Sequence, residues 1–479
     1  MENTEQPTRP TLICLGGGVE SMEIIKYIYN AGYRPVILDY NPQCAAAEWV
    51  AQLTAEWKIE NKRYNRRLAY HDRASNNGQR YENKKRLPAP SKYPPALFLK
   101  ANCYNWRSVD LAIRDALRSN RPETLKEKTF FENVVGVICC AVDAPIVQAH
   151  TAEWLRLPTI GIEAAKFGAH KHWQNERLAS TGVLVPRERA VNPQLAWEDV
   201  KDYDIVKPVD SSGARGVRFY TQDNYKEAFA EAMSYSLNEG MIIAQEFIDG
   251  MQISTESVIW NGQMVMNAMA QRNYDEALDR FSPYIIEDGS DSPAQIENAT
   301  IRRGIADAIE RSCAALGWNN CTVKSDIVVH PSGAVYVIEL APRLSGGYFA
   351  SHIIPAAYGW DILGDALSLA VGQPPALNLQ REWNYTCQRF IFQKPEWVGR
   401  RISNIPCADN TPGEVSSTHG ILVGAELLRW NYKPGDIIRP LKAHPDRLGM
   451  VLTTGSTAAE AEGLARDIVR WAMEEIKIE

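Results

Sequence analysis

The pattern of apolar and polar positions in the first 40 residues predicts a strand, a helix and a second strand. Residues 11–15 (TLICL) are apolar throughout, residues 22–33 carry apolar positions at helical spacing, and residues 35–40 (PVILDY) are apolar again. This order is typical of a β-α-β unit with a parallel sheet. The turn between the first strand and the helix, GGGVES, lacks the G-x-G-x-x-G spacing of dinucleotide sites. We interpret it as a tight turn that packs helix on strand.

The alternation of strand and helix patterns continues through the middle of the chain. Residues 144–157 predict a helix, residues 158–165 a short connection, and residues 170–183 a helix that stops at Gly182. From residue 203 to about residue 372, strands and helices alternate.

The last hundred residues have a different pattern. Short apolar runs predict strands within THGILVGAELL, GDIIRPL and RLGMVLTTG, and residues 456–476 predict a helix capped by Ser456. We therefore expect a small β-rich domain at the C-terminal end.

Composition limits the class of protein. The 479 residues exceed what one hydrophobic core organises, so several domains are expected. The net charge of −6 argues against a nucleic-acid partner, and no apolar run is long enough to predict a membrane span. The first residues lack the layout of a signal peptide, and the nine cysteines have neither zinc nor disulfide spacing. We expect reduced thiols in a cytoplasmic protein.

Residues 58–92 differ sharply from the rest of the chain. They contain eleven basic and three acidic residues, with interleaved tyrosines and many Asn, Gly and Pro. We interpret this basic insertion as a solvated or subunit-covering surface loop. The alternative is a contact with an anion or a nucleic acid.

A first candidate for chemistry is IVKPVDSSGARGV, residues 205–217. Lys207 ends a strand-like run, and a loop of serines and glycines follows. Backbone N–H groups in such a loop can converge on one anion, and the lysine would add a point charge for a phosphate. The pattern alone is also compatible with an ordinary hairpin whose strand-end lysine is solvated.

A second candidate is VKSDIVVHPSGAVYVIELAPRLSGG, residues 323–347. Two apolar strands flank the turn HPSG, and Asp326 and Glu339 lie on the two arms, 13 residues apart. A carboxylate within an apolar strand is costly unless it has a partner. A hairpin can set both acids side by side, where hard oxygen ligands near phosphate would bind Mg²⁺. Arg343 follows Glu339 by four residues and leads into another glycine turn.

Together these segments resemble the ATP-grasp superfamily. KPVDSSGARGV resembles its lid loop, K-P-x-x-x-S-G-x-x-G-V, and IELAPR resembles its metal strand, E-x-x-P-R. AAKFGAHKHWQNERLASTGVLVP resembles the helix that enters the fold, and MIIAQEFIDGMQISTESV resembles the hinge strand that reads adenine. The resemblance runs from about residue 12 to residue 479.

The resemblance implies a nucleotide site. Lys171 and Lys207 would contact the ATP phosphates. The lid loop would close over the β- and γ-phosphates through Ser211, Ser212, Gly213 and Gly216. The adenine hinge would consist of Gln245, Glu246, Phe247 and Ile248. Asp326 and Glu339 would hold Mg²⁺. The catalytic residues would be Lys207 and Arg343, which would face the reacting carboxylate and its acyl phosphate.

The resemblance also implies an organisation. Residues 1–160 would form a Rossmann-like α/β domain that precedes the ATP-grasp fold. Residues 161–372 would be the ATP-grasp domain, with a lid subdomain at about 184–245. Residues 373–479 would be the β-rich C-terminal domain. The fold class is thus α/β with α+β, and the family's tendency to dimerise makes a homodimer compatible with the sequence.

Three residues depart from the family pattern. His170 stands where the entry helix usually has Asp, and Ala341 replaces an Asn that often completes the metal set. Gln252 stands where many members have a ribose-binding Glu. We expect Glu256, on the same strand, to contribute to ATP binding instead.

The sequence allows two interpretations for some neighbouring residues. Arg280 and Glu287 either face the active site or are structural. His352 is as compatible with a satisfied core histidine as with a substrate contact.

The function that the resemblance implies is an ATP-dependent carboxylate–amine ligase, most like the amino-acid ligases that form dipeptides. It would make an acyl phosphate and release ADP and phosphate. The alternatives are a bicarbonate-using carboxylase, which would need a separate carrier because the chain has no biotinyl M-K-M site, and a non-catalytic ATP-binding regulatory protein. The identities of the carboxylate and the amine are not encoded in a short motif.

Overall fold

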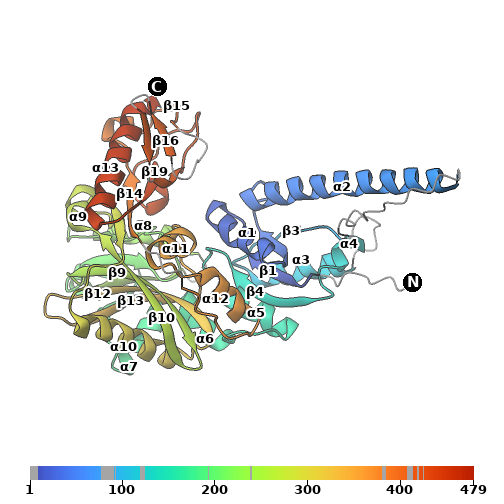
Figure 1. The fold of residues 1–479 in the computed structure, drawn as a ribbon. Coiled ribbons are helices and arrows are strands. Elements are labelled where there is room, and N and C mark those ends of the chain that lie inside the picture. Colours follow the sequence, from blue (N-terminus) through green and yellow to red (C-terminus); the bar gives the residue numbers. More distant parts are fainter. Residues whose placement is uncertain are drawn as a thin grey trace. The chain divides into compact units, whose positions relative to one another are not determined.

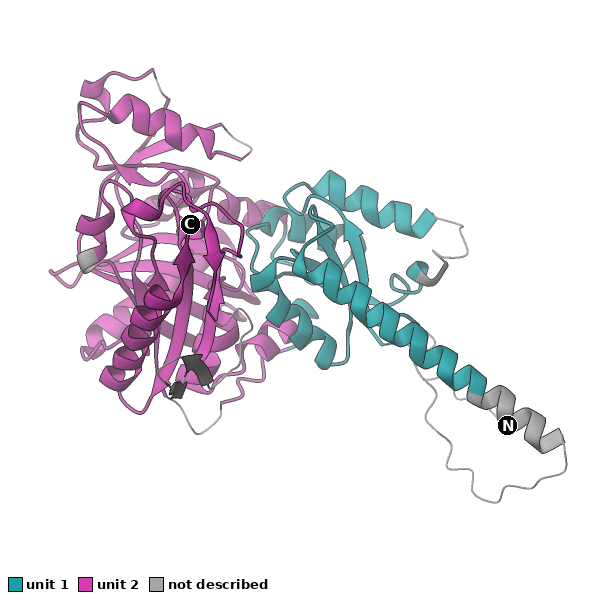
Figure 2. Cartoon of the chain, turned by 90° about the horizontal axis from the view of Figure 1, so that it is seen from above, with its two compact units in different colours: residues 1–161, 370–373 teal, residues 162–369, 374–479 magenta. Residues whose placement is uncertain are grey.

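The computed structural model divides the chain into two compact units (Figure 2). Unit 1 comprises residues 1–161 and 370–373, and unit 2 comprises residues 162–369 and 374–479. The residues that the structure describes are 9–76, 91, 93–118, 125–192, 194–237, 240–379, 384–406, 414–417, 420–423 and 425–479. The division into three domains that the sequence suggested stays a prediction.

Unit 1 is built on a four-stranded parallel sheet. Its order is β3-β2-β1-β4, from β1 (Thr11–Leu15), β2 (Arg34–Asp39), β3 (Leu97–Lys100) and β4 (Val134–Cys139). Helix α1 (Met22–Asn30) connects β1 to β2, α3 (Trp106–Arg118) lies between β3 and β4, and α5 (Pro145–Leu155) follows β4. The predicted β-α-β unit, its helix and both of its strands are confirmed.

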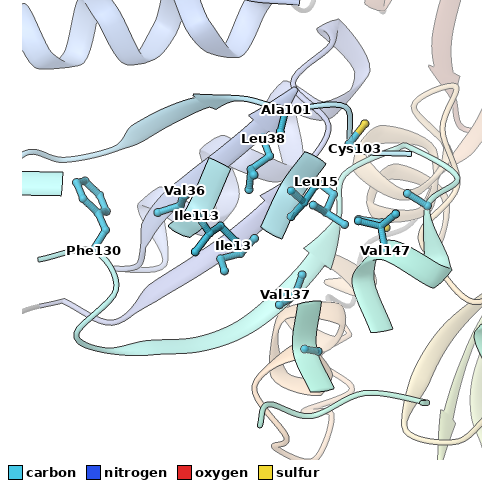
Figure 3. Packing of buried hydrophobic residues seen from close by; sticks show 14 residues of the cluster. Ile13, Leu15, Val36, Leu38, Ala101, Cys103, Ile113, Phe130, Val137 and Val147 are labelled. Carbon is cyan, nitrogen blue, oxygen red and sulfur yellow. The ribbon is translucent and has the colours of Figure 1, made fainter. Parts of the chain in front are cut away.

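The core of unit 1 is apolar on both faces of the sheet. On one face, Ile13, Leu15 and Leu38 pack against Ile113 of α3 and Val147 of α5 (Figure 3). The residues between them in β1 and β2, Leu12, Cys14 and Ile37, are also fully buried. Such continuous burial explains why these strands read as unbroken apolar runs.

The basic insertion is partly helical. Helix α2 runs from Ala45 to Asn76 and is 32 residues long (Figure 1). Our prediction of a loop is therefore wrong for residues 58–76. The segment 45–76 contains no Gly or Pro, and its Ala, Glu, Lys and Arg residues favour helix even without strong apolar periodicity. Residues 77–90 and 92 of the insertion lie outside the described part of the chain.

Unit 2 is dominated by an eight-stranded antiparallel sheet (Figure 1). Its order is β13-β12-β9-β10-β11-β14-β19-β18. The strands are β9 (Met251–Trp260), β10 (Gln263–Asn273), β11 (Gly289–Ser292), β12 (Cys321–Val329), β13 (Val335–Ala341), β14 (Tyr385–Ile391), β18 (Ala425–Trp430) and β19 (Gly449–Gly455). The C-terminal strands thus continue the central sheet.

A separate four-stranded sheet carries the lid loop. Its order is β5-β8-β6-β7, from β5 (Glu188–Val191), β6 (Ile205–Pro208), β7 (Arg218–Phe219) and β8 (Ile242–Gln245). Helix α8 (Tyr225–Ser234) covers it, and Phe229 packs against Val206 and Ile242 in a small core. This sheet lies within the predicted lid range.

The C-terminal region corrects two predictions. Helix α13 (Ala458–Glu475) is capped by Thr457, whose side chain accepts from the amide of Glu460. The predicted cap Ser456 instead donates to the Glu460 carboxylate. GDIIRPL forms no strand and contributes only an isolated bridge between Ile437 and Arg401.

The connection predicted at residues 158–165 is also shorter than expected, because α6 (Ile162–Ala169) already begins within it. The predicted helix that ends before Gly182 is α7 (Lys171–Ser180).

The remaining helices are α4 (Leu125–Lys128), α9 (Asp275–Phe281), α10 (Ala299–Leu316), α11 (Ile354–Tyr358) and α12 (Ile362–Ala370). The remaining strands are β15 (Ile402–Asn404), β16 (Glu414–Ser417), β17 (Gly420–Val423) and β20 (Lys477–Ile478). Among the described residues, no helix has the length and apolar character needed to cross a membrane.

Candidate active site

The two predicted metal-binding acids lie side by side on the central sheet. Strands β12 and β13 pair antiparallel, and Asp326 is directly opposite Glu339 in their register. Residues opposite each other in such a pair share one face of the sheet. On the other edge of β12, Ser254 of β9 is opposite Asp326 and donates a 2.9 Å hydrogen bond to its Oδ1. The hairpin therefore places two carboxylates on one face.

Cations surround Asp326. Lys324, two residues earlier on the same strand, contacts Asp326 Oδ2, and Arg272 NH1 of β10 lies 3.4 Å from Oδ1. Burial alone would raise the pKa of Asp326, but the charges of Lys324 and Arg272 outweigh it and hold the pKa well below its usual range. Asp326 is thus ionised at neutral pH.

The acid pair fits Mg²⁺ better than a metal held wholly by protein. Within the described ranges, no group of three or more His, Cys, Asp or Glu residues could hold a metal ion. Mg²⁺ usually keeps several waters and takes one or two carboxylates together with substrate phosphates. Asp326 and Glu339 match that requirement in number and in ligand type.

Lys171 links the acid pair to the lid loop. It is the first residue of α7, and its Nζ donates a 2.7 Å hydrogen bond to the carbonyl oxygen of Ser211. The same Nζ lies 3.3 Å from Glu339 Oε1. One ammonium group therefore contacts both the predicted metal strand and the predicted phosphate loop.

Lys207 lies in the same electrostatic neighbourhood. It is on β6 and only 5% exposed. Burial lowers its pKa, and the charged side chains close enough to act on it are those of Glu188, Glu339, Lys171 and Asp326. The structure thus brings the two predicted lysines and the two predicted acids together.

The lid loop turns through left-handed backbone. Gly213 and Gly216 have φ values of +67° and +70°, and Ala214 has +57°. A Cβ at Gly216 would lie 3.0 Å from Ala232 Cα, so this position requires glycine. Ser211 is buried and Ser212 exposed.

The predicted adenine hinge is partly engaged with the protein itself. The amide of Glu246 donates to Arg187 O at 3.0 Å, and the amide of Phe247 donates to Asp204 Oδ2 at 2.8 Å. The amides of two of the four predicted hinge residues are therefore already hydrogen-bonded within the protein. Ile248 is half-buried.

Sequence reasoning missed Glu188. This buried carboxylate accepts hydrogen bonds from Gln245 Nε2 at 2.7 Å and Asn175 Nδ2 at 2.8 Å, and it contacts His172 Nδ1 at 2.8 Å. It is also the acid that most strongly raises the pKa of Lys207. Only the pairing of Glu188 with Gln245 in β5 and β8 reveals this role, and no local motif marks it.

Arg343 and Glu256 lie close together, and Glu256 is opposite Lys324 in the register of β9 and β12. Arg343 NH1 donates to Leu344 O at 3.0 Å, and Glu256 Oε2 accepts from the amide of Ser345 at 2.9 Å. Burial raises the pKa of Glu256 to about 7, against the hydrogen bond from Ser345 and the charges of Arg343 and Lys324. The side chain of Glu256 has no exposed surface, so this geometry gives no support to a contact with ribose.

A second charged cluster adjoins Asp326. Glu287 contacts Arg272 and lies 3.6 Å from Arg447 NH2. Arg272 contacts both Glu287 and Asp326, so it links Glu287 to the acid pair. Arg280, by contrast, stacks over Phe281 and lies outside this cluster.

The departure at position 170 has a structural explanation. His170 is the N-cap of α7, and its Nδ1 accepts from the amide of Trp173 at 3.3 Å. The imidazole thereby performs the capping that an Asp would provide. Burial lowers the pKa of His170, which keeps the ring neutral and able to accept. His352 contacts Ser351 Oγ at 2.9 Å and Tyr348 edge to face.

Two family models match the chain. Residues 169–347 match the ATP-grasp domain, and residues 408–479 match the L-amino acid ligase C-terminal domain 2. No curated protein sequence matches the chain at a significant level.

Solved structures match over nearly the whole length. The L-amino acid ligase from Bacillus licheniformis has a TM-score of 0.66 at 15% identity, covering 98% of this chain and 99% of that one. The phosphoribosylglycinamide synthetase from Anaerococcus prevotii has a TM-score of 0.61 at 16% identity, covering 98% and 99%. The biotin carboxylase domain of a Hydrogenobacter thermophilus 2-oxoglutarate carboxylase has a TM-score of 0.59 at 13% identity, covering 99% and 91%. The predicted ATP-grasp fold is confirmed.

Proposed function

We propose that this chain, whose residues 169–347 match the ATP-grasp domain and whose residues 408–479 match an L-amino acid ligase C-terminal domain, is an ATP-dependent carboxylate–amine ligase. It would activate a carboxylate as an acyl phosphate and transfer the acyl group to an amine. The products are an amide, ADP and phosphate. The match of residues 408–479 to an L-amino acid ligase domain favours amino acids as substrates.

The observation that carries this proposal is the convergence of opposite charges on one face of the sheet. Asp326 is opposite Glu339, and Lys171 lies 3.3 Å from Glu339. Two acids and two lysines held this close have little use in stability, because buried charges cost desolvation energy. They suit a polyanion and its cation.

The phosphates of ATP would lie between the lysines and the lid loop. Lys207 and Lys171 would neutralise them, and the loop amides from Ser211 to Gly216 would donate to the β- and γ-phosphate oxygens. Asp326 and Glu339 would hold Mg²⁺, which supplies charge neutralisation of the phosphates when bound. Adenine would sit at Glu246 and Ile248.

Arg343 would orient the carboxylate substrate. One carboxylate oxygen attacks the γ-phosphorus in line, the bond from the γ-phosphorus to the bridging oxygen breaks, and ADP leaves. Positioning and electrostatic stabilisation supply most of the rate in this type of transfer. The product is an acyl phosphate, which water would hydrolyse.

The amine completes the reaction. It attacks the acyl carbon after losing one proton, the C–N bond forms, and the C–O bond to phosphate breaks. The second proton leaves the nitrogen as phosphate departs. Arg343 would stabilise the oxyanion of the tetrahedral intermediate. A closed lid loop would keep water out until then.

A substrate screen tests this proposal. Purified protein with Mg-ATP is incubated with single amino acids and with pairs, ADP release is measured, and products are identified by mass. We expect at least one pair to stimulate ADP release and to give a product lighter than the sum of its substrates by one water. Stimulation by bicarbonate alone would favour the carboxylase alternative. ATP binding without turnover for any acid or amine would contradict the ligase proposal.

A further inference from the structure

A turn of the C-terminal region abuts the lid loop. This turn, residues 442–447 and here called the C-terminal turn, joins the lid loop through its backbone: the amide of His444 donates a 3.0 Å hydrogen bond to Gly213 O. Pro445 lies beside the same glycine, since a Cβ placed on Gly213 would be 3.6 Å from Pro445 Cδ. Gly213 of the lid loop thus has a direct neighbour more than 200 residues later in the chain.

An ion pair makes a second link to the lid subdomain. Lys442 Nζ lies 2.8 Å from Glu231 Oε1 on α8. Glu231 also accepts from Arg218 NH1 at 2.8 Å and from Tyr284 Oη at 3.1 Å. Burial alone would raise the pKa of Glu231, but the hydrogen bonds from Lys442 and Arg218 hold it below its ordinary value. Glu231 is therefore ionised and joins three segments.

The C-terminal turn is itself fixed to the sheet that bears the acid pair. Asp446 Oδ2 accepts from the amides of Ala443 and Lys442 at 3.0 and 3.2 Å, which closes the turn. Arg447 NH2 donates to Glu287 O at 3.0 Å, and its guanidinium stacks 3.5 Å over Phe390. The turn is thus held both by its own hydrogen bonds and by contacts to neighbouring segments.

The imidazole of His444 lies among charged residues near the candidate active site. Its charged neighbours are Arg447, Arg272, Lys324 and Arg215, which come from the turn itself, the central sheet and the lid loop. Its Nε2 is buried and has no hydrogen-bond partner among the described residues. The turn therefore lies near charged residues of both the lid loop and the strands that flank Asp326.

We propose that the C-terminal turn is the fixed support against which the lid loop closes, and that Lys442 and His444 act as positioning residues for it. The C-terminal region would then control how completely ATP consumption is coupled to amide formation. This inference rests on the proposed function. A lid loop that has lost its contact with the C-terminal turn affects coupling only if the acyl phosphate must be shielded from water.

The test compares three variants. Lys442→Met removes the ion pair, Lys442→Arg restores a cation, and Lys433→Met is the matched control, an exposed lysine of the same region. Lys442 is itself 44% exposed, so its replacement should leave the fold intact, which thermal unfolding checks. The first readout is trypsin cleavage after Arg215, an exposed residue of the lid loop, followed by fragment mass.

We expect cleavage after Arg215 to be about two- to fivefold faster in Lys442→Met, as suits the loss of one partly exposed ion pair. Lys442→Arg and Lys433→Met should match the unchanged protein. Equal cleavage rates in all four proteins would overturn the proposal, and this readout does not depend on catalysis.

The second readout is coupling. With the substrate pair found in the screen, Lys442→Met should raise the KM for ATP about two- to fivefold and form less than one amide per ADP, while the unchanged protein forms one. An unchanged KM and a ratio of one would also overturn the support role. A different outcome is that no protein releases ADP but Lys442→Met is still cleaved faster. This would reject the ligase function and leave the proposed support role of the C-terminal turn intact.

Discussion

The two large sheets of this protein carry their charged residues in different places. In the parallel sheet of unit 1, the buried charges stand at the two ends of β2 (Arg34–Asp39). Elsewhere this sheet buries apolar side chains on both faces, with Ile13 fully buried on one face and Leu12 fully buried on the other. One face of the antiparallel sheet of unit 2 carries Asp326 and Glu339 as cross-strand neighbours. Burying apolar surface stabilises a fold, whereas burying charge costs free energy unless partners compensate. We infer that unit 2 accepts this cost because its charged face performs the chemistry.

The largest expected effect comes from removing one acid of that face. Glu339→Gln and Asp326→Asn should each lower kcat by about a thousandfold or more, because the phosphates lose their metal-bound neutralisation. Steady-state ADP release measures this. Glu297→Gln, an exposed acid of the same unit, is the matched control. Activity within tenfold of the unchanged enzyme in both acid variants would show that they hold no essential metal.

Lys207→Met should separate function from stability. We expect kcat/KM for ATP to fall about 100- to 1,000-fold, while the midpoint of thermal unfolding stays constant or rises. Lys207 is 5% exposed and burial lowers its pKa, so an apolar side chain of similar length relieves a desolvation cost. A marked fall in the midpoint, with activity retained, would mean that Lys207 is structural.

Leu38→Ala, in the parallel sheet of unit 1, should lower the stability of the protein and leave its catalytic activity nearly unchanged. Leu38 is 0% exposed, and truncation of such a residue lowers the free energy of unfolding by about 2–5 kcal/mol. We expect kcat/KM of the folded enzyme to stay within about twofold. Denaturant unfolding and initial rates at low temperature give the two values. A large loss of kcat/KM without loss of stability would contradict the assignment of a stabilising role to the unit 1 sheet and a catalytic role to the unit 2 sheet.

The cross-strand placement of the predicted metal-binding acids could be predicted because local patterns mark it. A charged residue that interrupts an apolar strand is conspicuous, and a hairpin of known turn fixes which residues oppose each other. Asp326 and Glu339 met both conditions, and Lys207 stood before a glycine loop.

What the sequence could not supply depends on pairing between distant segments. Glu188 meets Gln245 only because β5 pairs with β8, 57 residues apart. The docking of His444 on Gly213 likewise has no local sign. The long helix α2 escaped prediction for another reason, since a solvated helix lacks the apolar stripe on which periodicity depends.

A smaller effect distinguishes Glu256 from the ionised acids. Its pKa is raised from 4.5 to about 7 by burial. Between these pH values the unfolded chain loses the proton that the folded chain keeps, so stability falls as pH rises through this window, by up to about 3 kcal/mol. Glu256→Gln should remove this fall. Denaturant unfolding at several pH values from 4.5 to 7.5 measures it, and a parallel pH dependence in both proteins would show that Glu256 titrates normally.

The most direct measurement follows an oxygen atom. The carboxylate substrate found in the screen is labelled with ¹⁸O, and the released phosphate is analysed by mass. Attack of the carboxylate on the γ-phosphorus predicts one ¹⁸O per phosphate, formed in equal amount to ADP and lost in Glu339→Gln. Unlabelled phosphate together with amide would contradict an acyl phosphate and, with it, the role assigned to the charged face of unit 2.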